Sequence, residues 1–235
     1  MKTLLSLVLS LTIAASFLHG ADTFEGKIKM TITTQKGKKS ETMPMSYAIK
    51  DSKMRIDMEN PEKGGGTLST IVDMKAQEAT VLMPEQKMYM THSFKDSDLT
   101  QKAAEAAELT SVEKTNETTT IAGYKATKYL IKTKDQKEPV EVWATEGLGH
   151  YVSANAFGPG AGKNKSSGWE KALYEKGFFP LRTVVTEKRG TTTTMEVVNV
   201  EKTSLPDSLF KAPADYQKFA MPSLKGLIPG FGGKN

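Results

Sequence analysis

Cysteine is absent from this 235-residue sequence, and histidine occurs only three times. Without cysteine the chain can form no disulfide, has no thiolate to bind a metal and has no cysteine for lipid attachment after an export signal. The sequence also contains no Gly-x-Ser-x-Gly, His-Glu-x-x-His or paired-carboxylate motif. We therefore expect a protein that is not an enzyme and that holds no metal or other cofactor.

Long apolar runs are missing except at the N-terminus. There Lys2 is followed by an uncharged run at residues 4–18 and then by small residues at Gly20 and Ala21, a pattern typical of a secretory signal peptide. The run is shorter than the ~20 apolar residues that a transmembrane helix needs. We expect residues 1–21 to be removed near Gly20 or Ala21, so that the mature protein is periplasmic or secreted and does not span a membrane.

Charge of one sign does not accumulate either. The sequence has 32 lysine and arginine residues against 27 aspartate and glutamate residues, and both kinds alternate along most of the chain. A nucleic-acid interface needs clustered basic residues, usually with aromatic side chains between them. We therefore expect a mixed, solvated surface and no nucleic-acid partner.

What the sequence does have is apolar residues at every second position, the period of a β-strand with one buried face. Tight turn signals such as Lys36-Gly37-Lys38 and Pro84-Glu85-Gln86 separate these runs. The pattern predicts about eleven strands, at Phe24–Ile32, Met43–Ile49, Met54–Met58, Leu68–Met74, Glu78–Met83, Lys87–His92, Thr118–Ile121, Lys125–Thr133, Val140–Ala144, Leu181–Thr186 and Thr192–Val200.

Two segments break the strand pattern and favour helices. Ser97–Leu109 begins with a possible N-cap and continues with good helix formers, and Ser167–Lys176 places Trp169 and Leu173 at helical spacing before Gly177. The predicted fold is mainly β (α+β). It is a strongly curved antiparallel sheet that forms an open half-barrel, with one or two helices on its concave side. We expect one domain at 22–219 and a mobile tail rich in glycine and proline at 220–235.

Methionine is concentrated in the first half of the predicted domain, where nine of the 12 methionines lie between Met30 and Met90. Methionine is flexible and polarizable, so it fills cores and also adapts to ligands of variable shape. A concave face lined by such residues would be either an ordinary core or a cavity for an apolar ligand. The candidate cavity residues are Met30, Met45, Tyr47, Met54, Ile56, Met58, Met88, Met90, Trp169 and Leu173.

The stretch Lys87–His92 also allows a third interpretation. Met88, Met90 and His92 share one face of an extended strand, and thioethers with an imidazole can bind a cuprous ion. However, the same alternation occurs at Met54-x-Ile56-x-Met58, where no imidazole accompanies the thioethers. We therefore expect Met88 and Met90 to line the apolar side of the sheet, and His92 to lie near its rim without binding metal.

Several longer stretches resemble a known family. They are "TIAGYKATKYLIKT", "VEVWATEGLG", "GFFPLR" and "LPDSLFKAPADYQ", and together with the N-terminal strands they extend the resemblance to Tyr216. The family consists of exported bacterial domains of unknown function that look like members of the superfamily of the outer-membrane lipoprotein carriers LolA and LolB. The resemblance implies an incomplete antiparallel barrel with a hydrophobic cavity for acyl chains.

Taken as a structural element, Leu205-Pro206-Asp207 with Phe210 predicts a closing turn and an anchor. The function expected from the sequence is a non-catalytic protein that carries or senses a lipid, an acyl chain or another hydrophobic small molecule. The alternative is an interaction module with a filled core, whose edge strands or the loop at 158–168 bind another envelope protein.

Overall fold

The computed structural model describes residues 24–59, 66–94, 109–133, 138–149, 151–153, 169–170, 173, 176–187 and 190–219. These residues form strands, short 3₁₀ helices and part of one α-helical segment, and none of their helices is long and apolar enough to cross a membrane. In chain order the elements are β1 (Gly26–Lys36), β2 (Lys39–Lys50), β3 (Lys53–Glu59), β4 (Thr67–Asp73), β5 (Glu78–Met83), η1 (Pro84–Gln86), β6 (Met88–Ser93), β7 (Leu109–Ile121), β8 (Tyr124–Thr133), β9 (Val140–Thr145), β10 (Phe179–Thr186), β11 (Thr191–Lys202), η3 (Asp207–Phe210) and β12 (Gln217–Lys218).

All twelve described strands belong to one sheet with the order β12-β6-β5-β4-β3-β2-β1-β11-β10-β9-β8-β7. Every neighbouring pair is antiparallel except β12 and β6, which run parallel. The centre of the sheet joins the two ends of the domain, because β1 pairs with β11 from Gly26 opposite Lys202 to Lys36 opposite Thr191. The sheet is not closed, since β7 and β12 are its two edges.

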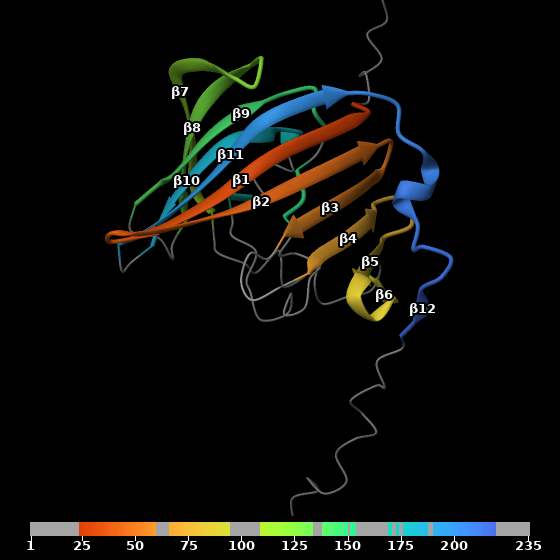
Figure 1. Ribbon diagram of the computed structural model, residues 1–235. Coiled ribbons are helices and arrows are strands. Elements are labelled where there is room, and N and C mark those ends of the chain that lie inside the picture. Colours follow the sequence, from red (N-terminus) through yellow and green to blue (C-terminus); the bar gives the residue numbers. More distant parts are fainter. Residues whose placement is uncertain are drawn as a thin grey trace, which may run out of the picture.

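The chain length between β6 and β7 favours a curved sheet, because a flat sheet would leave the connection almost no slack. These strands lie ten positions apart in the sheet order, which in a flat sheet would separate them by about 48 Å. The 15 residues 94–108 that connect them reach at most roughly 50 Å when fully extended. Curvature brings the two strands closer together, and Figure 1 shows the sheet bending away from β1 and β2 on both sides.

Alternation along each strand gives the sheet two different faces. One face carries the main buried core, which includes Ile28, Tyr47 and Ile56, and we call it the concave face. The opposite, convex face carries a smaller cluster built on Ala48, Ile71 and Leu82. Because Tyr47 and Ala48 are neighbours in the chain and both are buried, β2 is covered on both sides there.

Most of the predicted strands are confirmed, including β5 at the predicted residues Glu78–Met83. The hairpin between β7 and β8 turns at Ala122 and Gly123, which both have positive φ, as a two-residue hairpin turn requires. The strand predicted to begin at Thr118 instead begins at Leu109, with a register shift between Lys114 and Thr118. The sheet also has a twelfth strand, β12, that the alternation did not predict.

The predicted helices are described only in part. Leu109 of the first one lies in strand β7, and residues 97–108 lie outside the described residues. In the second segment Trp169, Glu170, Leu173 and Lys176 have helical backbone. The N–H of Phe178 donates to the carbonyl of Leu173 at 3.0 Å, and Gly177 has a φ of 67°. This is how a helix ends at a glycine in the left-handed region.

Candidate functional site

Strand pairing places the methionines predicted to line a cavity on one face. Tyr47 lies opposite Ile56, Ile56 opposite Thr70, Thr70 opposite Val81, and Val81 opposite Met90, so these five residues form one row across β2–β6. Met30, Met45 and Met58 form a second row in the same way across β1–β3. The expectation that Met90 shares the face of the core residues Tyr47 and Ile56 is therefore confirmed.

Burial changes along the row from the centre of the sheet to its rim. Tyr47 and Ile56 are each 1% exposed, and Thr70 and Val81 are nearly as buried, whereas Met90 is only half-buried. Its neighbours Met83 and Met88, which are paired with each other, are half-buried as well, and His92 is exposed. We call Met58, Met83, Met88 and Met90 the methionine rim.

The remaining candidates belong to a closed core rather than to an open surface. Seven of the ten are at most 5% exposed, and they are Met30, Met45, Tyr47, Met54, Ile56, Trp169 and Leu173. Aromatic rings fill the centre of this core: Tyr151 stacks on Trp169 with ring centroids 6.0 Å apart, and Phe179 meets the rings of Tyr47 and Tyr151 edge-on. In this conformation only Met58, Met88 and Met90 of the ten are accessible to a ligand.

A few hydroxyl groups interrupt this apolar core. Tyr47 donates a hydrogen bond to the carbonyl of Val152 at 3.3 Å, and the Tyr151 hydroxyl lies 3.5 Å from the sulfur of Met195. Burial raises the pKa of both tyrosines, so both hydroxyls stay protonated. Thr183 is 1% exposed, and its hydroxyl has no hydrogen-bond partner among the described residues. We call Tyr47, Tyr151 and Ser153 the hydroxyl cluster.

The convex face is covered by the chain that follows β11, residues 203–219, which we call the C-terminal strap. Figure 1 shows it running past the ends of β3–β6 to β12. Leu205 and Phe210 of the strap are 4% and 6% exposed and pack in one cluster with Ala48, Ile71 and Leu82. The closing turn and the anchor predicted at Leu205 and Phe210 are therefore confirmed.

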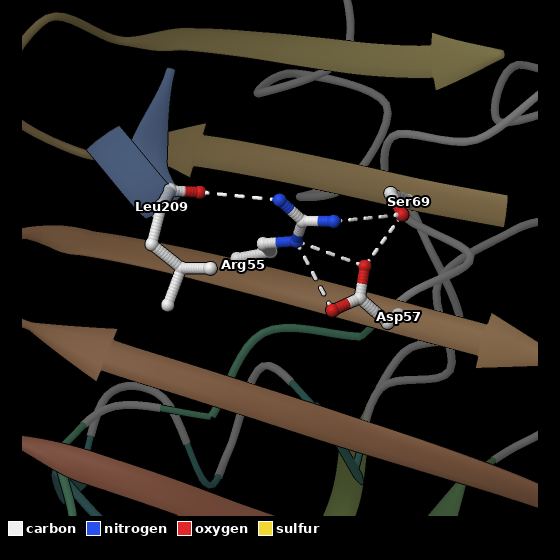
Figure 2. Close-up of polar contacts among 4 residues, drawn as sticks. All are labelled: Arg55, Asp57, Ser69 and Leu209. Carbon is white, nitrogen blue, oxygen red and sulfur yellow. Dashed lines mark hydrogen bonds and ion pairs between the residues drawn. The ribbon is translucent and has the colours of Figure 1, made fainter. Parts of the chain in front are cut away.

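A polar network on β3 and β4 joins the sheet to this strap (Figure 2). The Nε atom of Arg55 donates to both carboxylate oxygens of Asp57 at 2.9 and 3.0 Å, and Ser69 donates to Asp57 at 2.5 Å. The two other guanidinium nitrogens reach the Ser69 hydroxyl and the carbonyl of Leu209, at 3.3 and 3.4 Å. Ser69 is 1% exposed, so the geometry supports a structural clamp rather than a serine nucleophile.

Ion pairs hold the strap at two further points. Lys50 contacts Asp207 at 2.8 Å and Glu25 at 3.6 Å, and it donates to the carbonyl of Leu205 at 2.7 Å. A hydrogen bond from the N–H of Leu205 lowers the pKa of Glu25, and the hydrogen bond from Lys50 lowers the pKa of Asp207. The contacts of Glu25, Lys50 and Arg55 with the strap could not be predicted from the strand alternation, because they join residues more than 150 positions apart.

At the far end of the strap, β12 covers the outer edge of β6. The N–H groups of Gln217 and Phe219 donate to the carbonyls of Lys87 and Tyr89, at 2.8 and 2.7 Å. Lys87 and Asp215 add an exposed ion pair at 3.0 Å. Part of an edge strand is thereby protected from pairing with another chain.

No group of three histidine, aspartate or glutamate side chains converges on a metal position within the described residues. The predicted placement of Met88, Met90 and His92 on one face is confirmed by their pairing with Met83, Val81 and Ala79. The expectation that these three side chains do not bind a cuprous ion stays a prediction, and a titration with that ion tests it.

The described part of the chain is thus a single sheet with an apolar core, an accessible methionine rim and polar contacts that hold the strap against the sheet. A family model for a domain of unknown function, DUF4412, matches residues 24–216. The chain therefore belongs to the DUF4412 family, in line with the expected family of domains of unknown function. No curated protein matches the sequence.

Several solved structures are similar to this chain. PNGF-II matches with a TM-score of 0.47 and 17% identity over 85% of this chain, and this chain spans 32% of PNGF-II. A LolA superfamily protein from Nitrosomonas europaea matches with a TM-score of 0.37 and 9% identity, over 80% of this chain and 90% of that one. MucB in complex with MucA matches with a TM-score of 0.38 and 13% identity, over 86% of this chain and 58% of that one.

Proposed function

We propose that this protein is a non-catalytic binding protein of the bacterial envelope that holds an apolar ligand, such as an acyl chain, against the methionine rim. The observation that carries the proposal is the change in burial along the concave face. Tyr47 and Ile56 are sealed in the core, whereas Met88 and Met90, on the same face, are half-buried. Accessible methionines next to an apolar core suit ligands of variable shape.

The energy available from such a contact is sufficient without any reaction chemistry. Each buried methylene contributes about 0.8 kcal/mol, so a chain of about 14 carbons provides roughly 11 kcal/mol when it is fully buried. Association and ordering costs reduce this value. Because the rim covers only one side of a ligand, useful affinity also requires part of the chain to reach the deeper residues of the row that ends at Tyr47.

The proposal is tested by native mass spectrometry of protein purified from its own envelope, followed by lipid extraction and by titration with a fluorescent fatty acid. Met90→Asp should abolish probe binding, because the new carboxylate would face the ligand. Thr91→Asp is the matched control, since Thr91 lies next in the strand and points to the convex face, where it contacts Thr80. If no apolar ligand co-purifies and the wild-type protein does not bind the probe, the proposal is wrong.

A second function is favoured by the filled core itself. Trp169 and Leu173 pack in the same cluster as Met54, so the centre of the concave face leaves no open surface for a ligand. The alternative is an interaction module in which the edge strand β7 pairs with a strand of another envelope protein. Crosslinking in the envelope distinguishes the two functions, because a proline at Glu113, an exposed residue of β7, should remove the crosslinked partner without changing lipid binding.

The envelope location is part of the proposal and rests on the signal-peptide pattern of residues 1–21. Fractionation of cells followed by N-terminal sequencing tests it. The mature protein should begin near residue 21 or 22 and should be recovered from the periplasm or the medium. Recovery of the intact N-terminus from the cytoplasm would contradict this location.

A further inference from the structure

The methionines of this chain differ in how far water reaches them. Of the 12 methionines, Met1 and Met221 lie outside the described residues and the other ten lie within them. Met30, Met45 and Met54 are 1%, 3% and 5% exposed. The remaining seven are half-buried, and four of these form the methionine rim on β3, β5 and β6. More than half of the accessible thioethers of the described residues therefore gather on one part of the concave face.

Sealed and accessible methionines alternate with each other in the same rows of the sheet. Met45 lies between Met30 and Met58 in the row across β1–β3, yet Met45 is sealed and Met58 is half-buried. Met88 lies directly opposite Met83, and both are half-buried. These side chains share a chemical type and a face of the sheet, and they differ in their access to solvent. They are internal standards for one another in any reaction with a dissolved reagent.

The reaction open to an accessible thioether is oxidation by a hypohalous acid or a peroxide. The sulfur attacks the oxygen of the oxidant, an S–O bond forms, and the O–Cl or O–O bond breaks. Sulfur loses an electron pair, and the oxidant is reduced to chloride with release of a proton, or to water. The product, methionine sulfoxide, is polar, and methionine sulfoxide reductases return it to the thioether.

A sulfoxide at the rim is compatible with the fold, whereas one in the core is not. A half-buried sulfoxide keeps its oxygen in contact with water, so no buried acceptor is left without a partner. At Met45 the same oxygen would be enclosed among apolar side chains. The hydrogen bonds between β6 and β12 use the carbonyls of Lys87 and Tyr89, so a change in the methionine side chains of β6 removes none of them.

We infer that the methionine rim is an oxidation site, and that its conversion to sulfoxides by a hypohalous acid or a peroxide reversibly switches off binding of the apolar ligand. The inference rests on the proposed function and adds regulation to the same site. Each sulfoxide places an oxygen that needs water where the apolar chain must lie, so the ligand and the oxidised rim exclude each other. An envelope protein is also exposed to the oxidising surroundings outside the cytoplasm.

The order of oxidation is measured first, without any ligand. The folded full chain is treated with increasing amounts of hydrogen peroxide, and peptide mass spectrometry shows which methionines have gained oxygen. Because the chain has no cysteine, methionine is its most readily oxidised side chain. The rim should be oxidised before Met30, Met45 and Met54. Circular dichroism and thermal unfolding at the same doses should show a protein that is still folded.

Binding is then compared before and after oxidation by titration with the fluorescent fatty acid. Oxidation of the rim should weaken binding of this probe by about 10-fold or more, because a polar oxygen would lose its water to the ligand. Methionine sulfoxide reductases, with dithiothreitol as the electron donor, should restore the affinity. A protein that stays in the weakly binding state after reduction would contradict a reversible switch.

Two combined variants assign the effect to the rim. Replacement of all four rim methionines by leucine keeps the rim apolar and conserves its volume, so this variant should bind the probe and should keep its affinity after peroxide treatment. The matched control is Met43→Leu with Met74→Leu, two half-buried methionines outside the rim. The control retains every rim thioether, so peroxide should weaken its binding as it does in the wild type.

The outcomes separate the inference from the proposed function. If the reduced wild-type protein does not bind the probe, the proposed function is wrong and the switch falls with it, whatever the order of oxidation. If the sealed methionines are oxidised as early as the rim, or if the oxidised protein binds the probe as tightly as the reduced protein, the inference is overturned while the proposed function stands. Loss of binding on oxidation of the leucine variant, or loss of cooperative unfolding in the oxidised wild type, would also overturn it.

Discussion

Replacement of Leu173 by alanine tests whether the concave side of the sheet is filled. Leu173 is 1% exposed and belongs to the main core together with Trp169, Met54 and Phe179. It comes from the connection between β9 and β10, not from the sheet, so its burial reports directly on how that connection packs. The truncation removes apolar atoms and leaves a space that the surrounding rings can fill only in part.

The expected cost is large. A buried leucine truncated to alanine destabilises a protein by about 2–5 kcal/mol, because the transfer free energy and the cavity both contribute. The packed aromatic rings of Tyr151, Trp169 and Phe179 favour the upper half of this range, since stiff rings relax little around a new cavity. For a domain of this size the midpoint of thermal unfolding should fall by roughly 4–20 °C.

Urea unfolding followed by tryptophan fluorescence measures the effect, because Trp169 lies in the affected core. Val198→Ala is the matched control: Val198 is 56% exposed, so its truncation should change the free energy of unfolding by less than about 0.5 kcal/mol. A cost below about 1 kcal/mol for Leu173→Ala would mean that Leu173 is not packed in the core. The concavity would then be open, and the filled-core alternative would lose its main support.

Three other predictions concern the rim, the strap and the centre of the sheet. Met88→Leu and Met90→Leu should each cost less than about 1.5 kcal/mol in urea unfolding, as volume-conserving changes do, and a larger loss would mean that the thioethers have a specific role. The pKa values of Glu25 and Asp207 are lowered from 4.5 and 3.8, so the two ionised carboxylates stabilise the fold above these values. This stabilisation is lost as the pH falls below them and the carboxylates are protonated. Unfolding midpoints measured from pH 6 to about pH 3 should therefore fall more steeply for the wild type than for Lys50→Met. Gly26→Ala should destabilise by about 1–3 kcal/mol, because the new methyl group would overlap the carbonyl of Glu201 on β11; an unchanged thermal midpoint would show that the two strands separate easily there.

The strands could be predicted because most of them have one face in a core and one face less buried. On β3, Met54 and Ile56 are buried and alternate with Arg55 and Asp57, which are only partly buried. β4 shows the limit of this rule, because four consecutive residues, Ser69–Val72, are all buried. A continuous buried run means that both faces are covered, and this run, like Tyr47–Ile49 on β2, is a local sign of the strap on the convex side.

The elements that could not be predicted depend on partners far away in the chain. β12 has two residues and exists because the N–H groups of Gln217 and Phe219 meet carbonyls on β6. The start of β7 was missed because Leu109 follows the alanine-rich segment that favours a helix, whereas its pairing with Thr133 on β8 makes it a strand. In both places tertiary pairing decides the structure, and local propensity is too weak to oppose it.

The sequence analysis named more candidate cavity residues than are accessible in the structure, for a related reason. Alternation identifies the concave face correctly, but it does not show which part of that face the chain itself covers. Leu148, Tyr151 and Trp169, from the β9–β10 connection, belong to the core that buries Tyr47 and Ile56, and the strap buries Ala48, Ile71 and Leu82 on the convex face of β2, β4 and β5. Half-buried methionines therefore persist on the concave face near its β6 end. A ligand gains most where apolar surface is still exposed to water, so Met88 and Met90 are the residues whose substitution should alter binding more than stability, and the sealed residues Met30, Met45 and Met54 are those whose substitution should alter stability first.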